Sequence, residues 1–509
     1  MSYVLSVDAG TTATKVCLFN EDGALISSHT QEYRLKTPTP LHVEIDAETL
    51  WHAFTVGVTS TVQQAKVQPA DIVAIGISAQ GETLIPVDKT GSPLRPAIVW
   101  LDNRAQDEAN ILDAEFNDGS SYQITGQVKI VPTWPAAKIL WLKRNEKRLF
   151  DKVHKFLLVE DYLIYRMTGQ YVCEGSLITS TAYWDIITEQ WWDDMLQYLS
   201  IQADQLPEIM FSGQIVAELN QQAAKELRLS RQTVVTTGAL DQVAGAIGVG
   251  NVQPGMFSEN TGAALAICAP VENPIFDPQR QMPIHYFGIP HTYMAHTFTT
   301  GGMVYKWFRD TFCSQEIDAA SRSDLSAYYL MDQAAKHVEA GCEGLLMLPH
   351  LQGAMAPEAN PLAKGVFYGI TLRHTKAHFI RAIMESIACT IKRNIDVLEK
   401  LGIRVHEIRS LGGGSKSPLW NQIKADLTQR TILTTEVLEE AACLGAAILA
   451  GKAVGLYKDI HTACEKMVHI KTRYDPNPKN FATYEKTYRR YVQLYENLCN
   501  MFSEQKTHH

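Results

Sequence analysis

The chain has 509 residues, 46% of them hydrophobic, and a formal net charge of −9. This length predicts two or more domains, and the acidic balance argues against a nucleic-acid partner, because phosphate backbones need lysine and arginine surfaces. No apolar run reaches the length of a membrane-spanning helix, so no membrane contact is expected.

Strands and helices are predicted to alternate along the chain, which indicates an α/β protein. Apolar runs at residues 4–7 and 16–19 flank a turn. Further strands are expected at residues 73–77, 97–100, 234–238, 257–268, 345–349 and 408–411. Helices are expected at residues 138–143, where Pro135 lies in the first turn, at 378–401 and at 484–502.

A glycine-rich stretch that ends in proline, residues 245–254, predicts a domain boundary near Val249. We therefore expect an N-terminal domain over residues 1–248 and a C-terminal domain over residues 249–509. Each half opens with strands around a turn of glycine and threonine, Gly10-Thr11-Thr12 in the first and Asn260-Thr261-Gly262 in the second. Two weakly similar halves are one expectation from this pattern.

Nine cysteines are scattered without a CxxC pair, and no basic, apolar signal segment precedes the first strand. These features predict reduced thiols in a cytoplasmic protein. Cys389 and Cys443 lie in apolar helical patterns and are expected in the core. The two terminal histidines are either a native end or a remnant of an expression tag.

The turn Asp8-Ala9-Gly10-Thr11-Thr12-Ala13-Thr14-Lys15 carries the strongest functional signal. An acid ends one strand, a glycine allows a tight turn, and threonine hydroxyls and a lysine follow. Such a turn presents backbone N–H groups and hydroxyls to phosphate oxygens, and Asp8 can hold Mg²⁺ directly or through water. The alternative interpretation is an ordinary hairpin turn.

Two long patterns resemble those of the FGGY family of carbohydrate kinases, and the resemblance covers nearly the whole chain. The first is Pro135-x-x-Lys138-Ile139-x-Trp141-Leu142-x-Arg144-Asn145, preceded by a departure from the family at Thr133. The second is Gly365-x-Phe367-x-Gly369-Ile370, then seven residues, then His378-Phe379-x-x-Ala382-Ile383-Met384-Glu385. The resemblance implies two actin-like (ribonuclease H-like) α/β ATPase domains that close on a central cleft, where ATP and a sugar meet.

Transfer of a phosphoryl group from ATP to a hydroxyl needs a positioned base, Mg²⁺ and donors around the phosphates. Asp241 follows a strand that ends in glycine and is the candidate base, with a helix N-cap as the alternative role. Gln242 resembles a family position that hydrogen-bonds the substrate. Lys15 suits a phosphate as a point charge; a solvent-exposed lysine at a strand end is the alternative.

The resemblance implies that both domains bind ATP. The matched nucleotide positions are Thr11, Thr12 and Lys15 in the first phosphate loop, Thr261 and Gly262 in the second, Gly302 and Lys306 beside the nucleotide, and Gly413 and Ser417 in the adenosine loop. Residues 441–447 are small and predict close helix packing without chemistry.

The acceptor loop is expected at residues 78–83, where Gln80, Gly81 and Glu82 stand at positions that contact sugar in the family. Glycerol kinases have Gln-Arg-Glu there, xylulokinases Gln-Met-His, and erythritol kinases Gly and then an acid. The Glu82 carboxylate can accept hydrogen bonds from vicinal hydroxyls. Trp134 is a candidate for stacking on a sugar face, with a core position as the alternative. Asp102 and Arg104 are expected to pair with each other, outside the site.

Four functions compete. The first is a pentulose kinase of xylulokinase type, and the second is a glycerol or tetritol (erythritol-type) kinase. The third is an actin-like or chaperone-like ATPase, against which the Glu82 loop and the two long patterns argue. The fourth is an inactive binding homologue, against which Asp8, Thr11, Asp241 and the glycine loops argue. The acceptor, the regulation and the oligomeric state, for which a homodimer is considered, stay open.

Overall fold

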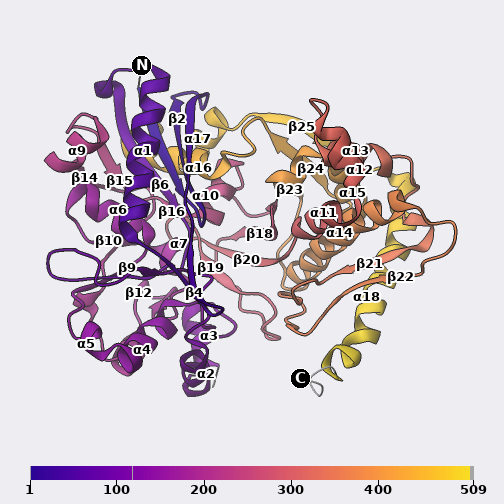
Figure 1. Cartoon of the computed structure of the whole chain (residues 1–509), viewed down its shortest axis with the longest axis horizontal. Coiled ribbons are helices and arrows are strands. Elements are labelled where there is room, and N and C mark those ends of the chain that lie inside the picture. The colour runs from indigo at the N-terminus through magenta and orange to yellow at the C-terminus, as the bar shows by residue number, and fades with distance from the viewer. Residues whose placement is uncertain (1, 117–118, 505–509) are drawn as a thin grey trace.

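The computed structural model describes residues 2–116 and 119–504, so the terminal histidines lie outside the described residues. Two large mixed sheets lie side by side (Figure 1). The first has the order β14 (Ile215–Glu218), β15 (Val234–Thr236), β6 (Ile72–Ala79), β1 (Tyr3–Ala9), β2 (Ala13–Asn20) and β3 (Leu25–Glu32), and β16 (Ala239–Leu240) also pairs with β6. The second has the order β19 (Ile284–Tyr286), β20 (Tyr293–Thr300), β18 (Ala264–Val271), β17 (Met256–Thr261), β23 (Glu407–Leu411), β24 (Thr431–Thr435) and β25 (Ile470–Tyr474).

The two sheets repeat one topology. In the first, β1 pairs antiparallel with β2 and β2 with β3, while β1, β6 and β15 are parallel and β14 closes the sheet antiparallel. In the second, β17, β18 and β20 form the antiparallel part, β17, β23 and β24 are parallel, and β25 closes the sheet antiparallel. The expectation of two similar halves is therefore confirmed at the level of strand order and direction.

Helices cover the sheets. The first domain carries α1 (Ala47–Ala65), α6 (Val159–Thr168), α9 (Gln221–Leu227) and α10 (Asp241–Gly248), and the second carries α11 (Met303–Phe312), α14 (Lys376–Lys400), α15 (Pro418–Thr428), α16 (Ala441–Ala453), α17 (Ile460–Met467) and α18 (Phe481–Glu504). The central strand β6 is buried at all but one position, as is typical of strands covered on both faces. Asp46 begins α1 as its N-cap and accepts a hydrogen bond from the backbone N–H of Glu48 at 3.1 Å.

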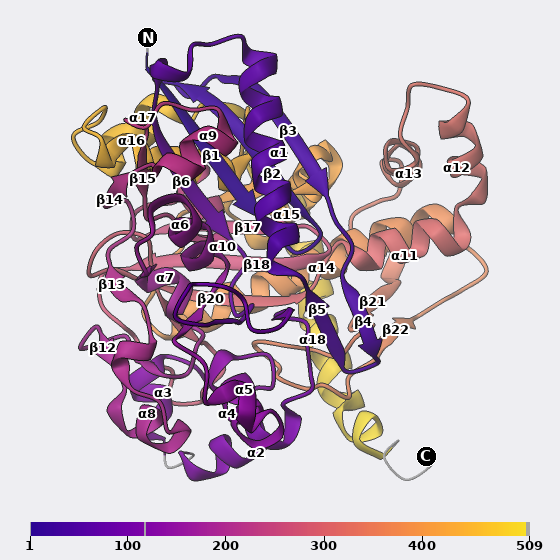
Figure 2. The ribbon, with the colours of Figure 1, turned by 60° about the vertical axis from the view of Figure 1, so that its left-hand side comes forward.

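A smaller group of helices lies at one end of the first domain in both views (Figure 2). It contains α2 (Gln106–Glu115), α3 (Ser120–Thr125), α4 (Pro135–Asn145), α5 (Lys147–Phe150) and α8 (Asp193–Leu199), whose buried residues form much of a second hydrophobic cluster. Pro135 occupies the first position of α4, as predicted.

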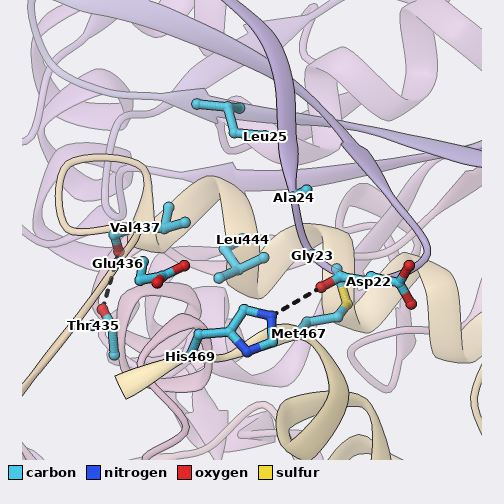
Figure 3. A pocket seen from close by; sticks show the side chains of 10 residues that line it. All are labelled: Asp22, Gly23, Ala24, Leu25, Thr435, Glu436, Val437, Leu444, Met467 and His469. Atoms are coloured by element: carbon cyan, nitrogen blue, oxygen red, sulfur yellow. Dashed lines mark hydrogen bonds between the residues drawn. The ribbon is translucent and has the colours of Figure 1, made fainter. Parts of the chain in front are cut away.

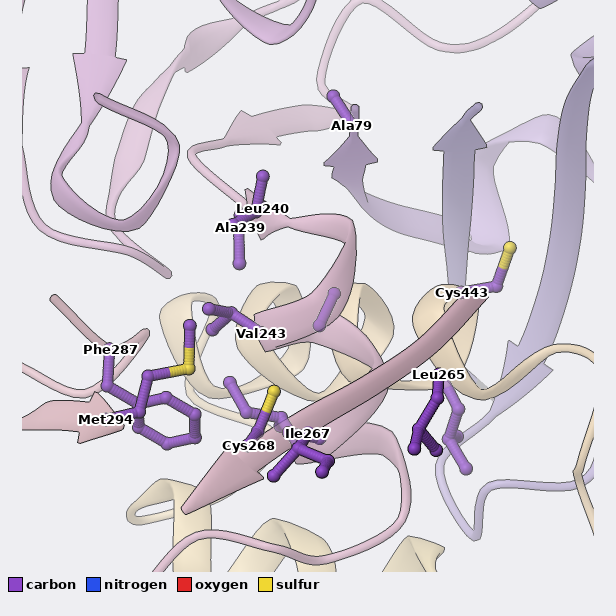
Figure 4. Packing of buried hydrophobic residues seen from close by; sticks show 14 of the residues in the cluster. Ala79, Ala239, Leu240, Val243, Leu265, Ile267, Cys268, Phe287, Met294 and Cys443 are labelled. Carbon is purple, nitrogen blue, oxygen red and sulfur yellow. The ribbon is translucent and has the colours of Figure 1, made fainter. Parts of the chain in front are cut away.

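Two helices lie between the sheets and join the halves. Helix α10 packs against β6, β18 and α16, and α16 packs against β1 and β6 although it comes late in the chain. Helices α10 and α16 approach each other closely because Gly445 lies where they cross. A Cβ on Gly445 would lie 1.8 Å from the carbonyl oxygen of Ala244. Figure 4 shows Val243 of α10 among buried side chains of β18, with Ile267 and Cys268 labelled. The predicted small-residue packing of residues 441–447 is confirmed.

The expected elements agree with the structure apart from their ends. The predicted strand over residues 97–100 is shorter, since β8 contains only Ala97–Ile98, and the run 257–268 is two strands, β17 and β18. The proposed boundary between residues 248 and 249 stays a prediction, and the packing of α16 on the first sheet crosses it. No helix among residues 2–116 and 119–504 is both long and apolar enough to span a bilayer. All nine cysteines are free thiols, and Cys389 and Cys443 are buried as expected.

Candidate active site

The carboxyl ends of three neighbouring strands bring the predicted catalytic residues together. In the parallel register, Asp8 of β1 and Ala239 of β16 both lie opposite Ser78 of β6. Asp8 is the next-to-last residue of β1, and Gln80 and Asp241 directly follow β6 and β16, so the three residues share one edge of the sheet. This is the edge at which open α/β sheets bind ligands.

Both aspartates at this edge have raised pKa values. Burial and, to a smaller extent, the charges of Asp8 and Glu82 together raise the pKa of Asp241 to about 8. Burial also raises the pKa of Asp8, although its carboxylate accepts a hydrogen bond from the Ser78 hydroxyl at 3.2 Å. Asp241 is the first residue of α10 and accepts from the backbone N–H of Gln242 at 2.7 Å, so it is not the N-cap, which is Leu240.

This pair of carboxylates fits Mg²⁺ better than a fully protein-bound metal. No group of three or more His, Cys, Asp or Glu residues in the described ranges is arranged to hold a metal ion. Magnesium in phosphoryl-transfer sites is held by one or two carboxylates together with substrate phosphates. Two acids with raised pKa values, close enough to repel, would be stabilised by such a cation.

A ring of hydrogen bonds ties the first phosphate loop to the acceptor loop. Gln80 donates from Nε2 to the carbonyl oxygen of Gly10 at 2.9 Å, and its Oε1 accepts from the Thr83 hydroxyl at 3.1 Å. Thr83 Oγ1 accepts from the backbone N–H of Trp100 at 3.1 Å, and the Trp100 indole donates to Thr11 Oγ1 at 2.8 Å. The polar atoms of Gln80 are thus committed to holding the two loops together.

Glu82 stands in a strained part of the acceptor loop. Its φ is 55°, in the left-handed region that a residue with a side chain rarely adopts. Its carboxylate accepts from the Ser180 hydroxyl, its backbone carbonyl accepts from Lys138 Nζ at 2.8 Å, and burial raises its pKa. A Cβ on the preceding Gly81 would lie 3.0 Å from Leu240, so this glycine lets the loop approach the segment that carries Asp241.

The predicted nucleotide positions of the second domain converge on Thr261 and Gly262. The backbone N–H of Gly302, the N-cap of α11, donates to the carbonyl oxygen of Gly262 at 2.8 Å, and a Cβ on Gly302 would clash with that oxygen at 2.4 Å. A Cβ on Gly414 would lie 2.6 Å from Thr261, whereas the space beside Gly413 is open. Three loops therefore meet here, with room at Gly413.

Four of the predicted site residues have protein partners in this structure. Lys15 Nζ donates to the carbonyl oxygen of Glu439 at 3.1 Å and pairs with Glu440 at 3.4 Å, across the two halves. Lys306 is exposed and pairs with Asp310 one turn later at 2.7 Å. The Ser417 hydroxyl, as N-cap of α15, accepts from the backbone N–H of Trp420, and Trp134 packs against the second hydrophobic cluster.

Two further predicted residues lie beside Asp8 and Asp241, at the sheet edge that we call the reactive edge. Thr12 is exposed in the first phosphate loop, and its carbonyl oxygen accepts from the backbone N–H of Tyr33 at 2.9 Å. Gln242 is half-buried beside Asp241, and its carbonyl oxygen lies 3.8 Å from Cys268 Sγ of the second domain. Asp102 and Arg104 form the expected ion pair at 2.7 Å.

Sequence reasoning did not name the residues that support the loops as site residues, although Thr83 lies within the predicted acceptor loop. Thr83, Trp100 and Ser180 all contact the predicted acceptor loop or the first phosphate loop. Trp100 is the last residue of the predicted strand 97–100, and this placement at a strand end was a usable signal. No sequence signal marked Ser180, since its partner Glu82 is 98 residues away.

A cavity of about 370 Å³ lies away from this centre, where the turn after β2 meets the second half (Figure 3). His469 Nε2 lies 3.2 Å from the carbonyl oxygen of Asp22 across it. None of the predicted site residues lines this cavity, whose walls are Asp22, Gly23, Ala24, Leu25, Thr435, Glu436, Val437, Leu444, Met467 and His469.

Comparisons with known proteins match the whole chain. The profile of the FGGY family of carbohydrate kinases, N-terminal domain, matches residues 3–248, and that of the C-terminal domain matches residues 266–454. The gluconokinase of Bacillus subtilis (strain 168) is 29% identical, covering 99% of this chain and 97% of its own. The xylulose kinase of Escherichia coli (strain K12) is also 29% identical, covering 98% of this chain and 100% of its own. The crystal structure of ligand-bound xylulose kinase from Lactobacillus acidophilus superposes with a TM-score of 0.90 at 27% identity. The match covers 99% of this chain and 100% of that protein.

Proposed function

Because the chain belongs to the FGGY family of carbohydrate kinases, we propose that it phosphorylates a terminal hydroxyl of a neutral small sugar, a pentulose such as xylulose, with ATP as donor. The observation that carries the choice of a neutral acceptor is the charge around the reactive edge. Asp8, Glu82 and Asp241 place three carboxyl groups there.

Among the described residues, Lys15 and Lys138 are the lysines whose charges act on Asp8 and Glu82, and both already have partners, Lys15 with Glu440 at 3.4 Å. Lys138 Nζ donates to three backbone carbonyls, and Arg104 pairs with Asp102 and with Glu44 at 2.7 Å each. His296, which lies 3.5 Å from Cys268 on the second-domain side, is neutral, because burial lowers its pKa to about 4. An anionic acceptor such as gluconate would meet these carboxyl groups without a free cation to compensate its charge, whereas sugar hydroxyls can donate to carboxyl oxygens.

Overall identity does not separate the two candidate acceptors, since the gluconokinase of Bacillus subtilis and the xylulose kinase of Escherichia coli are both 29% identical to this chain. A pentulose is neutral and gluconate carries one negative charge at neutral pH, so a site whose cations are already paired favours the pentulose.

We assign the following roles. Asp241 accepts the proton of the attacking hydroxyl, and its raised pKa of about 8 makes it a stronger base than an ordinary aspartate. Glu82 accepts hydrogen bonds from acceptor hydroxyls. The loops at Gly10–Thr12 and Thr261–Gly262 surround the phosphates from the two domains. Mg²⁺, when bound at Asp8, neutralises phosphate charge.

The test is a substrate panel with purified protein. ATP turnover is measured with xylulose, ribulose, erythritol, glycerol and gluconate at equal concentrations, and Asp241→Asn serves as the control for contaminating kinases. We expect the highest kcat/KM with a ketopentose and at least about tenfold less with gluconate. A preference for gluconate would overturn the charge argument, and a preference for glycerol or erythritol would support the second candidate class.

The division into residues 1–248 and 249–509 and a cytoplasmic location remain part of this proposal. The nine free thiols support the location, because a reducing compartment maintains free cysteines.

A further inference from the structure

Two lysines of this chain are fully buried, which is rare for an ammonium group. Among the described residues, only Lys138 and Lys424 combine a lysine side chain with 0% exposure. Each lies directly beneath a loop that the proposed function uses, one in each half of the molecule.

Lys138, on α4, supports the acceptor side. Its Nζ donates to the carbonyl oxygens of Glu82 at 2.8 Å, Val99 at 3.0 Å and Ile98 at 3.4 Å. The three hydrogens of an ammonium match these three acceptors. One of the acceptors belongs to the left-handed Glu82, and another directly precedes Trp100, whose indole holds Thr11.

The left-handed backbone at Glu82 needs such a partner. A residue with a side chain occupies this region only when its surroundings enforce it. The ammonium of Lys138 binds the Glu82 carbonyl directly, and no glycine takes the position. Without the ammonium, Glu82 can relax to an ordinary backbone conformation and carry its carboxylate away from the acceptor.

Lys424, on α15, supports the nucleotide side. Its Nζ lies 2.6 Å from Glu259 Oε1 and 3.3 Å from Ser410 Oγ, and both members of the ion pair are fully buried. The other carboxylate oxygen of Glu259 accepts from the Thr261 hydroxyl at 2.5 Å, and Ser410 also donates to Glu259. The pair thus fastens the ends of β17 and β23, from which the second phosphate loop and the loop at Gly412–Gly414 extend.

We infer that Lys138 and Lys424 are positioning residues with separate targets, Lys138 for the acceptor and Lys424 for the nucleotide. Neither touches the reacting atoms: Lys138 acts through Glu82 and Trp100, and Lys424 acts through Glu259 and Thr261. The inference rests on the proposed function for the identity of the acceptor loop.

Because the two lysines have different targets, a variant of one lysine serves as the control for a variant of the other. In Lys138→Met the acceptor KM should rise at least about tenfold, the scale of a lost charged hydrogen bond, with the KM for ATP within about twofold of wild type. The double variant Lys424→Met/Glu259→Gln should show the reverse. It removes both charges, because Lys424→Met alone would leave Glu259 buried without its partner.

KM is the suitable readout because it does not depend on the fraction of folded enzyme, whereas the maximal rate does. Lys143→Met, which changes an incompletely buried lysine on the same helix α4, is the matched control and should leave both KM values unchanged. A merely structural role predicts loss of maximal rate at constant KM, or an equal rise of both KM values. Either result would overturn the inference.

A pH series adds a second readout. Burial, together with the charge of Arg104 and against the opposing effect of Glu82 and Asp102, lowers the pKa of Lys138 to about 7. The acceptor KM of wild type should therefore rise above pH 7 relative to that of Lys138→Met, in which no ammonium remains to be lost. Parallel pH profiles would contradict the role of the ammonium.

The predicted effect of Lys424 on nucleotide binding can also be measured without any acceptor. ADP affinity, measured by calorimetry with Mg²⁺, should weaken at least about tenfold in Lys424→Met/Glu259→Gln and stay unchanged in Lys138→Met. If wild type phosphorylates none of the sugars, the proposed function fails, while this ADP pattern still decides the inference. Equal ADP affinity in all variants would overturn it.

Discussion

The most informative perturbation is Asp241→Asn, which keeps the size of the side chain and removes its ability to take a proton. Losing a general base lowers the rate by about 10²–10⁴-fold. The environment adds a dependence on pH, because burial and the charges of Asp8 and Glu82 raise the pKa of Asp241 to about 8. At pH 7 only about a tenth of the free enzyme then carries the ionised base, and at pH 9 about nine tenths does.

The ratio of wild-type to Asp241→Asn activity should therefore grow about tenfold between pH 7 and pH 9. The ratio is the quantity to measure, since the titration of other groups affects both proteins alike and cancels. Rates are taken with both substrates well below KM, so that they report on the free enzyme. A ratio that is constant from pH 6 to pH 9 would mean that Asp241 has an ordinary pKa or is not the base.

The stability of the variant provides the control for folding. An acid whose folded pKa is raised destabilises the folded state once it ionises, so stability is lost as pH rises from about 4 towards 8. Asp241→Asn removes that loss, and its melting temperature should exceed that of wild type more at pH 8 than at pH 5. A variant that melts below wild type at pH 8 would contradict the unfavourable environment assigned to Asp241.

Four further outcomes are expected. Glu82→Ala should lower acceptor kcat/KM by about 10- to 150-fold, the scale of a charged hydrogen bond, with the KM for ATP little changed; an unchanged acceptor KM and kcat would remove Glu82 from the site. ATP hydrolysis without acceptor should be much slower than sugar-dependent turnover if the acceptor favours domain closure; equal rates would favour an ATPase instead. Gly445→Ala should lower the free energy of unfolding by about 1–3 kcal/mol in denaturant titrations, because its Cβ would lie 1.8 Å from Ala244 O; an unchanged midpoint would contradict that packing. Removing Mg²⁺ with a chelator should abolish transfer, and re-addition should restore it; full activity without the metal would exclude a role for Asp8 as its ligand.

The sequence predicted the strands and the acids at their ends because both signals are local. Asp8 and Asp241 directly follow apolar runs, and parallel strands bring such ends to one edge without further information. The ends of elements were less predictable. The strand at residues 97–100 stops at Ile98, because the backbone N–H of Trp100 bonds to the side chain of Thr83 instead of a neighbouring strand.

Side-chain partners distant in sequence could not be predicted. The phosphate contact of Lys15 stays a prediction, but its partners Glu439 and Glu440 lie more than 400 residues later in the chain and could not be predicted. Lysine is usually exposed, so nothing local indicated that Lys138 is buried among carbonyl oxygens. Its place in the first family pattern was visible in the sequence, and only the three-dimensional contacts show what it holds.

The packing of α16 on the first sheet has a consequence for how this protein is made. Every strand of that sheet has been synthesised once residue 240 is translated, but α16 follows about 190 residues after α10 ends. At about 5–20 residues per second, the nascent first domain waits on the order of 10–40 s for the helix that covers β1 and β6. During that interval an apolar sheet surface is open to solvent, so nascent chains stalled between residues 250 and 440 should bind chaperones more strongly than chains extended past residue 453.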